Sequence, residues 1–455
     1  MFNRRDFLSR ALGGTSLLAV GSVVPEFLAN TAVAANRVEK PRDTILVVVE
    51  LSGGNDGLNT LAPYADDLYQ KARPTLAITR KDVLKIDDYH GLHPSMTALK
   101  GLYDQKKLAV VQGVGYPNPD RSHFESMDIW QLADPRRAQT SGWLARTIPG
   151  MSTKEAGVPG MYIGQERLPL ALQGADGGVI SLADRESFRL QLSGNAAPRK
   201  KLIEDLNADD GNAELAAFVR KRQLQTYTSL QKIEEALKDF GNQPQPGQPI
   251  PQPVGGPRRG GNQDETDLKT LTGKLNLISK LIQKGLGTRI YYASTGGFDT
   301  HSGQADTHDA LLGDVSGAIS RFFDTLAGEH GGRVVLITYS EFGRRVKENG
   351  SRGTDHGAAS CMFVAGPKVV GGLVGKHPKL DDLTDGDLRY GIDFRSVYGA
   401  LLDDWLGVDS RGVLGEKQPP LPAPLVDLDK KVEPNPAVPG GPKPTAPGTP
   451  IPSKN

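Results

Sequence analysis

The sequence contains a single cysteine, Cys361, among its 455 residues. A chain with one thiol cannot close an internal disulfide, so its stability has to come from a buried core. The charges also nearly cancel, with 54 basic and 53 acidic side chains. Because a balanced chain has no long-range attraction for nucleic acid or for an anionic membrane surface, we expect neither as a main partner.

Long apolar runs are also missing. Beyond the first 34 residues, no segment is apolar over the roughly 20 residues that cross a bilayer, so we expect no integral membrane segment in the mature chain. The N-terminus itself has the order of a twin-arginine export signal. Arg4 and Arg5 precede a short apolar run, Ala11–Val24, and then the small residues Ala32–Ala34.

We expect residues 1–34 to be a removed signal, with the twin-arginine machinery as one partner and the periplasm or the cell surface as the destination. The alternative is an N-terminal membrane helix, but glycines interrupt the apolar run. As generally understood, this route carries folded proteins, many of which have taken up a metal or cofactor before export.

Short runs of β-branched apolar residues predict strands that are covered on both faces: Ile45–Val49, Leu108–Val114, Arg289–Ala293 and Val334–Tyr339. Apolar residues between these runs recur at helical spacing, as they do at Leu311, Val315, Ile319 and Phe323. This alternation predicts an α/β domain over residues 42–425, with a layered, mostly parallel central sheet and helices on both faces. Cys361–Ala365 is expected to add a strand, and Phe394–Trp405 a closing helix.

One stretch of the chain differs in composition from its surroundings. Helical patterns at roughly 212–240 and 265–286 flank a segment, 241–264, that is rich in Pro, Gly and Gln. We expect residues 212–286 to form a helical hairpin that projects from the domain, with the segment between its arms a disordered linker. A proline-rich docking motif is the alternative for that linker. The tail, 426–455, has the same composition and is expected to be disordered.

Reactive side chains follow the predicted strands, where ligands bind in open α/β sheets. After the first strand, Gly53 and Gly54 allow a sharp turn that would let Asp56 face a cleft, although Asp56 could equally cap that turn. After the second strand comes Ser122. It is either the N-cap of a helix or a nucleophile, because a helix N-terminus stabilises the negative charge that develops near it.

The third strand is followed by Asp299 and His301, just after two glycines. A carboxylate and an imidazole two residues apart in a loop can point at one divalent ion, and this pair of donors suits zinc or manganese. A surface loop in which His301 binds only backbone is the alternative.

The fourth strand ends at Glu341, where a buried acid or a metal ligand is expected. Asp355 and His356 follow between glycines as further candidate ligands. The neighbouring Arg344 and Arg345 would neutralise a phosphate or sulfate group, or else remain solvated charges.

Taken together, these motifs resemble those of the exported proteins called domain-of-unknown-function family 1501. The resemblance covers roughly residues 42–410 and rests on five segments: Leu51–Gly57, Ser122–Phe124, Gly296–His301, Ser340–Arg344 and Gly353–Gly357. The family name supplies no reaction. More distantly, the family resembles the alkaline phosphatase and sulfatase superfamily, whose members hold one or two divalent ions above a parallel sheet.

The superfamily resemblance implies roles for individual residues. Asp56 would be a first metal ligand, Ser122 would occupy the nucleophile position, and Asp299 with His301 would bind one ion. Glu341 would stand near the superfamily's late Asp-His pair, and His356 would match a last histidine.

The sequence departs from the superfamily at Phe342, which stands where that pair has its histidine and cannot bind a metal. Either Asp355 and His356 fold back to replace it, or a second metal site is lost.

Two functions follow from these patterns. The first is an exported, metal-dependent hydrolase or transferase of phosphate or sulfate esters, acting on a small-molecule or polymer substrate. In it His123 and Arg344 would meet the charge on the transferred group, and calcium rather than zinc or manganese would favour sulfatase-like chemistry. The alternative is a non-catalytic exported binding or assembly protein that captures a partner through its hairpin.

Overall fold

The computed structural model describes residues 42–151, 158–164, 167–174, 179–183, 233–237, 266–326, 328 and 330–432. All of them except Arg42 belong to one compact unit, Asp43–Asn455. The expected export signal (1–34) and the linker (241–264) lie outside the described residues. So does most of the expected tail.

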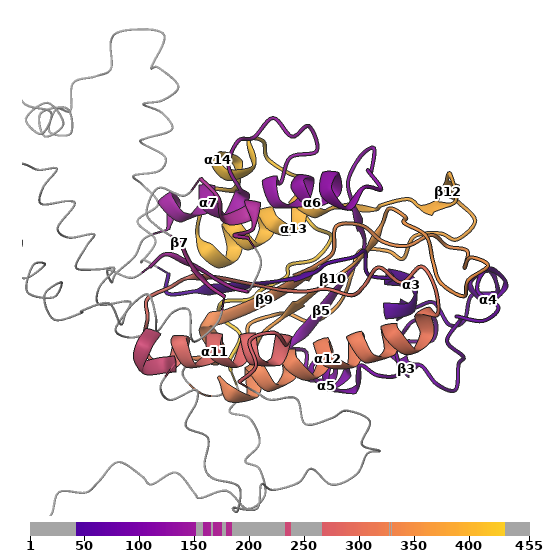
Figure 1. The fold of residues 1–455 in the computed structure, drawn as a ribbon, viewed down its shortest axis with the longest axis horizontal. Helices are drawn as coiled ribbons and strands as arrows, with labels where there is room; N and C mark the ends of the chain where they lie inside the picture. The colour runs from indigo at the N-terminus through magenta and orange to yellow at the C-terminus, as the bar shows by residue number, and fades with distance from the viewer. Residues whose placement is uncertain are drawn as a thin grey trace, which may run out of the picture. The chain divides into compact units, whose positions relative to one another are not determined.

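A mixed central sheet organises the described residues (Figure 1). Its strand order is β11-β5-β10-β9-β1-β8-β6-β7, and β14 also pairs with β5. The strands are β1 Ile45–Leu51, β5 Leu108–Gly115, β6 Gly160–Ile163, β7 Val179–Leu182, β8 Ile290–Thr295, β9 Val334–Tyr339, β10 Ser360–Ala365, β11 Gly372–Val374 and β14 Ile392–Asp393. Every pairing is parallel except those of β10 with β5 and β9, which confirms the mostly parallel sheet.

The continuous apolar runs form strands because both faces of the sheet are covered. All of β1 is buried. Its side chains alternate between two cores, with Val47 and Val49 in one and Leu46 and Val48 in the other. A strand with one wet face would instead have shown polar residues at every second position.

Helices cover the two faces of the sheet, as expected (Figure 1). One face carries α5 (Thr97–Asp104), α11 (Leu271–Gln283) and α12 (Gln304–Thr325). The other carries α6 (His123–Leu132), α7 (Trp143–Thr147), α13 (Phe394–Ala400), its π-helical continuation Leu401–Leu406, and α14 (Ser410–Leu414).

Small elements complete the domain beside the sheet. The short helices α3 (Gly57–Thr60) and α4 (Asp67–Ala72) lie near a three-stranded sheet of β2 (Leu61–Ala62), β4 (Gly91–Leu92) and β3 (Leu84–Lys85). A hairpin joins β12 (Leu383–Thr384) to β13 (Asp387–Leu388). Within the described ranges, no helix is both long and apolar enough to cross a membrane.

The described part of the expected hairpin does not project from the domain. Helix α11 packs along α12, and its Leu275, Ile278 and Leu281 are fully buried in one of the two cores. Ile233 and Leu237, in the described part of the first arm, are buried in the same core. The expectation of a projecting hairpin is therefore wrong for these segments, because their apolar faces cover the sheet. The rest of 212–264 lies outside the described residues.

The folded chain also continues beyond residue 425, where the tail was expected to begin. Val426 is buried and bridges Val369, and the Asp427 amide donates to the carbonyl of Lys368. The segment 426–432 is thus part of the domain rather than of a disordered tail.

The directions of the strands determine which of their ends lie at the same edge of the sheet. Strands β1, β8 and β9 pair in parallel, and β5 runs with them because β10 is antiparallel to both β5 and β9. Their carboxyl ends therefore share one edge of the sheet.

We predict that Ile278→Ala in α11 destabilises the protein by about 2–5 kcal/mol, because it leaves a cavity in the core. The exposed Gln283→Ala on the same helix is the matched control and should change stability by less than about 0.5 kcal/mol. Denaturant unfolding measures both. Equal, negligible effects would mean that α11 is not a core helix.

Candidate metal centre

The loops that follow β1, β5, β8 and β9 converge at the shared edge of the sheet. Gly53, after β1, has a φ of +120°, and a Cβ there would lie 2.5 Å from the amide nitrogen of Asp299. The absence of a side chain thus lets the first loop lie directly against the loop after β8.

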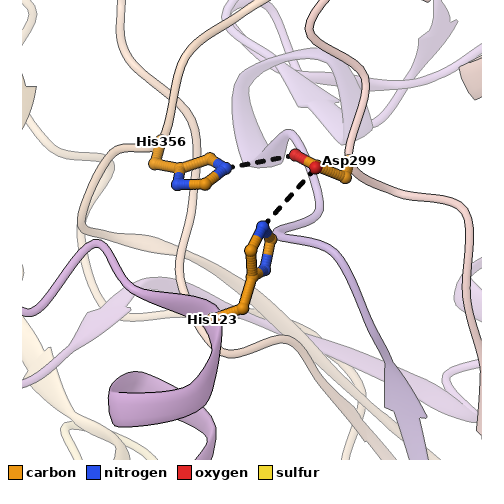
Figure 2. Close-up of side chains that lie close together, drawn as sticks. All are labelled: His123, Asp299 and His356. Carbon is orange, nitrogen blue, oxygen red and sulfur yellow. Dashed lines mark hydrogen bonds and ion pairs between the residues drawn. The ribbon is translucent and has the colours of Figure 1, made fainter.

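A group of three side chains forms where these loops meet: His123, Asp299 and His356 (Figure 2). The Nε2 atom of His123 lies 3.5 Å from Oδ2 of Asp299. The Nε2 atom of His356 lies 3.1 Å from Oδ1 of the same carboxylate. One ligand atom from each residue lies within 4.8 Å of the other two. They come from the start of α6, from the loop after β8 and from the loop between β9 and β10.

The hydrogen bonds behind the two imidazoles decide which nitrogen carries the proton. Nδ1 of His356 lies 2.7 Å from the carbonyl oxygen of Arg121, which can only accept, so Nδ1 is protonated. Nδ1 of His123 lies 2.7 Å from Oε1 of the buried carboxylate of Glu341 and donates to it. In the neutral form of each ring Nε2 then carries the lone pair and faces Asp299, which is the tautomer that metal-binding histidines adopt.

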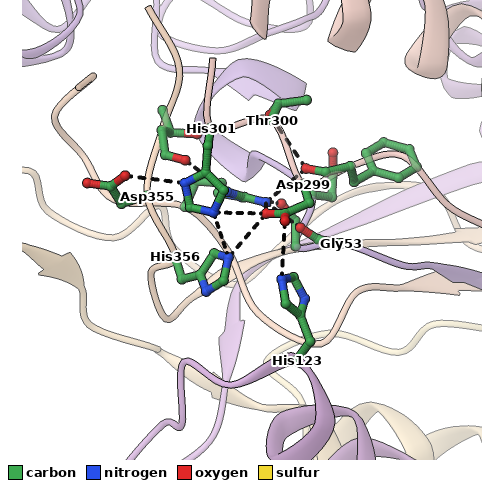
Figure 3. Close-up of polar contacts among 12 residues, drawn as sticks. Gly53, His123, Asp299, Thr300, His301, Asp355 and His356 are labelled. Atoms are coloured by element: carbon green, nitrogen blue, oxygen red, sulfur yellow. Dashed lines mark hydrogen bonds and ion pairs between the residues drawn. The ribbon is translucent and has the colours of Figure 1, made fainter. Parts of the chain in front are cut away.

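His301 stands beside this group in the same orientation (Figure 3). Its Nε2 lies 2.9 Å from Nε2 of His356 and 3.1 Å from Oδ1 of Asp299. Its Nδ1 faces Oδ1 of Asp355 at 3.3 Å. Lone pairs on two nitrogens this close repel each other unless a proton or a cation lies between them. The contact therefore needs either a proton on one of the two Nε2 atoms or a cation between them.

The donor set and its spacing fit a transition-metal ion. Two ligand atoms of a tetrahedral zinc site, each about 2.0–2.1 Å from the ion, lie about 3.3 Å apart. The separations of 3.5 and 3.1 Å between the imidazole nitrogens and Asp299 bracket that value. Imidazole with a single carboxylate suits zinc or manganese, whereas calcium takes six to eight oxygen ligands.

Asp299 is fixed by Arg344 rather than by the imidazoles alone. The buried guanidinium donates to Oδ1 at 2.7 Å. It also donates to the carbonyl oxygens of Gly53, Gly54, Phe298 and Thr354. Burial acts to raise the pKa of Asp299, but the hydrogen bonds from Arg344 and His356 outweigh it and hold the pKa at about 2. Asp299 is thus an anion at any working pH.

These contacts correct the role expected for Arg344. Its N–H groups donate to acceptors of the protein, and its side chain is fully buried. Arg344 therefore positions Asp299 and does not contact a substrate.

Glu341 does not join the group, although it was expected to bind the metal. Its Oε1 accepts from the Gly53 amide at 2.8 Å and from His123, and its Oε2 accepts from the Ser340 hydroxyl. The hydrogen bond to Glu341 is the main reason why the pKa of His123 is raised. Glu341 therefore orients the candidate ligand His123 through its Nδ1 atom. Asp355 does the same for the more exposed His301.

Phe342, the residue that departs from the superfamily pattern, is buried against both imidazoles. Its ring centroid lies 4.9 Å from that of His123 and 4.6 Å from that of His356. It forms an apolar floor that fixes both rings by packing. One of the two expected arrangements had Asp355 and His356 fold back to replace the missing histidine. Of these two residues, His356 joins the group, from the loop between β9 and β10.

Asp56 lies outside the group and is saturated by protein contacts. Its Oδ2 lies 2.5 Å from a nitrogen of the buried Arg73, and Gln304 also donates to that oxygen. Its Oδ1 accepts from the amides of Leu58 and Asn59 at the start of α3. Burial acts to raise the pKa of Asp56, but Arg73 outweighs it and lowers the pKa. The expected metal ligand is thus the N-cap of a helix and half of a buried ion pair.

Ser122 occupies the N-cap position of α6, yet its side chain makes no capping hydrogen bond. The Ser122 amide donates to Oδ1 of Asp120 instead. The residue is exposed, directly beside His123. An exposed serine without a capping bond thus stands at the helix N-terminus, one residue before the candidate ligand His123.

The sequence did not indicate that His123 is a candidate metal ligand, because His123 was expected to contact the transferred group instead. It also gave no indication that Arg121 contributes. One signal was available: His123 follows a buried strand in the same way as the other candidates do. No pattern in the sequence pointed to the carbonyl of Arg121.

The fold and the group define an α/β protein with a candidate metal centre at the carboxyl ends of parallel strands. The chain belongs to the family described as "Protein of unknown function (DUF1501)", whose model matches residues 43–414. No curated protein matches the sequence.

Among solved structures, the chain is similar to the PsFucS1 sulfatase from Pseudoalteromonas sp.. The TM-score is 0.33 at 10% sequence identity, over 88% of this chain and 73% of the sulfatase chain. At this TM-score the similarity says nothing about the chemistry of the site.

We predict that Asp299→Asn and Asp56→Asn have opposite effects. Asp299→Asn should lose most of the bound zinc or manganese, and it should cost less stability than Asp56→Asn, because the Asp299 side chain is 47% exposed whereas that of Asp56 is fully buried. Asp56→Asn should retain the metal but lose about 3–5 kcal/mol, because it leaves the charge of Arg73 buried without its partner. Elemental analysis and denaturant unfolding measure the two properties. Loss of the metal in Asp56→Asn would instead indicate that Asp56 is a metal ligand.

Proposed function

We propose that the protein is a metal-dependent hydrolase or transferase of phosphate or sulfate esters. The observation that carries the proposal is the convergence of imidazole nitrogens on Asp299, each with its other nitrogen already bonded to an acceptor. An exposed serine at a helix N-terminus directly precedes His123 in the sequence.

His123, Asp299 and His356 would hold the ion, with His301 as a further ligand on the exposed side. A zinc or manganese ion bound there would polarise an ester oxygen and lower the pKa of a nearby hydroxyl. Glu341 and the Arg121 carbonyl keep His123 and His356 in the tautomer that binds metal. Arg344 keeps Asp299 ionised and in place.

Ser122 is the proposed nucleophile. Its hydroxyl oxygen would attack phosphorus or sulfur and displace the alcohol of the ester, which leaves with the serine proton. The resulting ester of Ser122 would then be cleaved by water in a hydrolase or by an acceptor alcohol in a transferase. The amide groups in the first turn of α6 would stabilise negative charge near that oxygen, because the N-terminus of a helix is its positive end. The absence of a capping bond leaves the Ser122 hydroxyl available for this step.

A non-catalytic binding or assembly protein is the alternative. It was motivated by Phe342 in place of a histidine, by the expected hairpin and by the proline-rich tail. Phe342 packs against two candidate ligands, and the described parts of the hairpin segment are buried in the core, whereas most of 212–264 and of the tail lies outside the described residues. The non-catalytic function remains the conclusion to draw if no ester is turned over.

Export by the twin-arginine route is part of the proposal, with the periplasm or the cell surface as destination. We predict that replacing Arg4 and Arg5 by lysine leaves the protein in the cytoplasm, because the export machinery reads the arginine pair. Cell fractionation measures the distribution. Unchanged export of this double variant would refute the route.

We predict that the metal-loaded protein hydrolyses an aryl phosphate or an aryl sulfate. Chelation should abolish turnover, and zinc or manganese should restore it. Ser122→Ala should lower kcat by at least about 100-fold, because the attacking oxygen is removed. Initial rates with p-nitrophenyl phosphate and p-nitrophenyl sulfate measure the effect.

The matched control is Ser95→Ala, which removes a hydroxyl that bonds His93 away from the metal group. It should leave turnover unchanged. If Ser122→Ala retained full activity while Asp299→Asn lost it, a water molecule rather than Ser122 would be the nucleophile.

A further inference from the structure

A cavity of about 860 Å³ adjoins the candidate metal centre. Its lining includes Asn118, Asp120, Arg121, Asp385 and Tyr390. Two direct contacts join it to the centre. The Arg121 carbonyl accepts the Nδ1 proton of His356 at 2.7 Å, and Oδ1 of Asp120 accepts the Ser122 amide proton at 2.7 Å. The cavity is within the usual size of a small-molecule site, about 300–1,000 Å³.

The cationic side chains of this cavity are already paired. Arg121 lies 2.5 Å from Oδ2 of Asp387, and Arg389 lies 3.0 Å from Oδ1 of Asp382. Because the charge of each guanidinium is met by a carboxylate of the protein, the cavity is poorly suited to a second anionic group of a ligand.

The remaining polar side chains of the lining can accept hydroxyl protons. The carboxylates of Asp120 and Asp385 only accept, whereas Asn118 and Thr384 both accept and donate. Tyr390 adds a phenol ring that is 39% exposed. A lipid chain would bury these polar groups without partners, at a cost in free energy. A ring that carries several hydroxyl groups would satisfy the acceptors and pack one apolar face on Tyr390.

We propose that this cavity binds a carbohydrate, which forms the alcohol part of the ester. The assignment of that alcohol rests on the proposed function, whereas the binding of a neutral sugar does not. Residues 118–121 line the cavity and Ser122 follows them on the same loop, so an occupant of the cavity would lie near the start of α6.

Direct binding tests the proposal independently of turnover. The probes are neutral sugars, namely glucose, galactose, fucose and lactose, with glycerol as the small-polyol control. Saturation-transfer NMR on the metal-loaded full chain should show contact with at least one sugar and none with glycerol. Tyr390→Ala should weaken that contact about tenfold or more, whereas Tyr390→Phe, which keeps the ring, should retain it.

The carboxylate is tested by Asp385→Asn. Asp385 has a φ of +53°, a conformation that asparagine also adopts, so the backbone is preserved. The loss of a hydrogen bond to a charged group should weaken sugar binding about tenfold. Asp381→Asn removes the same charge from a neighbouring exposed residue outside the lining and should have no effect.

Turnover separates the two proposals. Hexose 6-sulfate and 6-phosphate should be better substrates than the p-nitrophenyl esters, and Tyr390→Ala should lower kcat/KM for the hexose esters alone. Aryl ester turnover without sugar binding would overturn the carbohydrate proposal and leave the hydrolase intact. Sugar binding without turnover of any ester would uphold the cavity and refute the hydrolase. Equal effects of Tyr390→Ala and Asp381→Asn would also overturn the assignment of the cavity.

Discussion

The candidate centre depends on the buried guanidinium of Arg344. Its donors reach carbonyl oxygens in the loops after β1 and β8 and in the loop between β9 and β10, and one of them holds Asp299. A single side chain therefore joins segments separated by hundreds of residues. Arginine suits this position because its planar group offers five N–H donors in a fixed geometry and stays charged when buried. A lysine has too few donors to reach the same acceptors.

A second buried ion pair, between Asp56 and Arg73, stabilises the loop after β1 at the same edge of the sheet. Arg73 also donates to the carbonyl oxygens of Arg345 and Val346, so it ties α4 to the loop that carries His356. Each of the two arginines thus pairs with one carboxylate. The other donors of Arg344 bond to backbone carbonyls, and those of Arg73 bond to backbone carbonyls and to Oδ1 of Asn59. Only Asp299 keeps its carboxylate open to the imidazoles, and that difference separates a candidate ligand from a structural acid.

The fold could be predicted from the sequence to a large extent, and the site only in part. Runs such as Ile45–Val49 are apolar at every position, as expected of a short strand that is covered on both faces. Asp299, His301 and His356 were found because they follow strands whose ends share one edge. The partners of Asp56 were not predictable, since any acid after a glycine turn has the same local pattern whether it faces an arginine or a metal. The packing of α11 was missed for a similar reason: an amphipathic helix shows that one face is covered but not by what.

The candidate ligands differ in their access to water. The side chains of His301 and Asp299 are 45% and 47% exposed, whereas His356 is 20% exposed and Glu341 is fully buried. An ion can thus approach from the His301 side while the opposite side stays rigid. Loading and exchange of the ion would then proceed in the folded protein, at rates governed by the movement of one exposed loop rather than by unfolding.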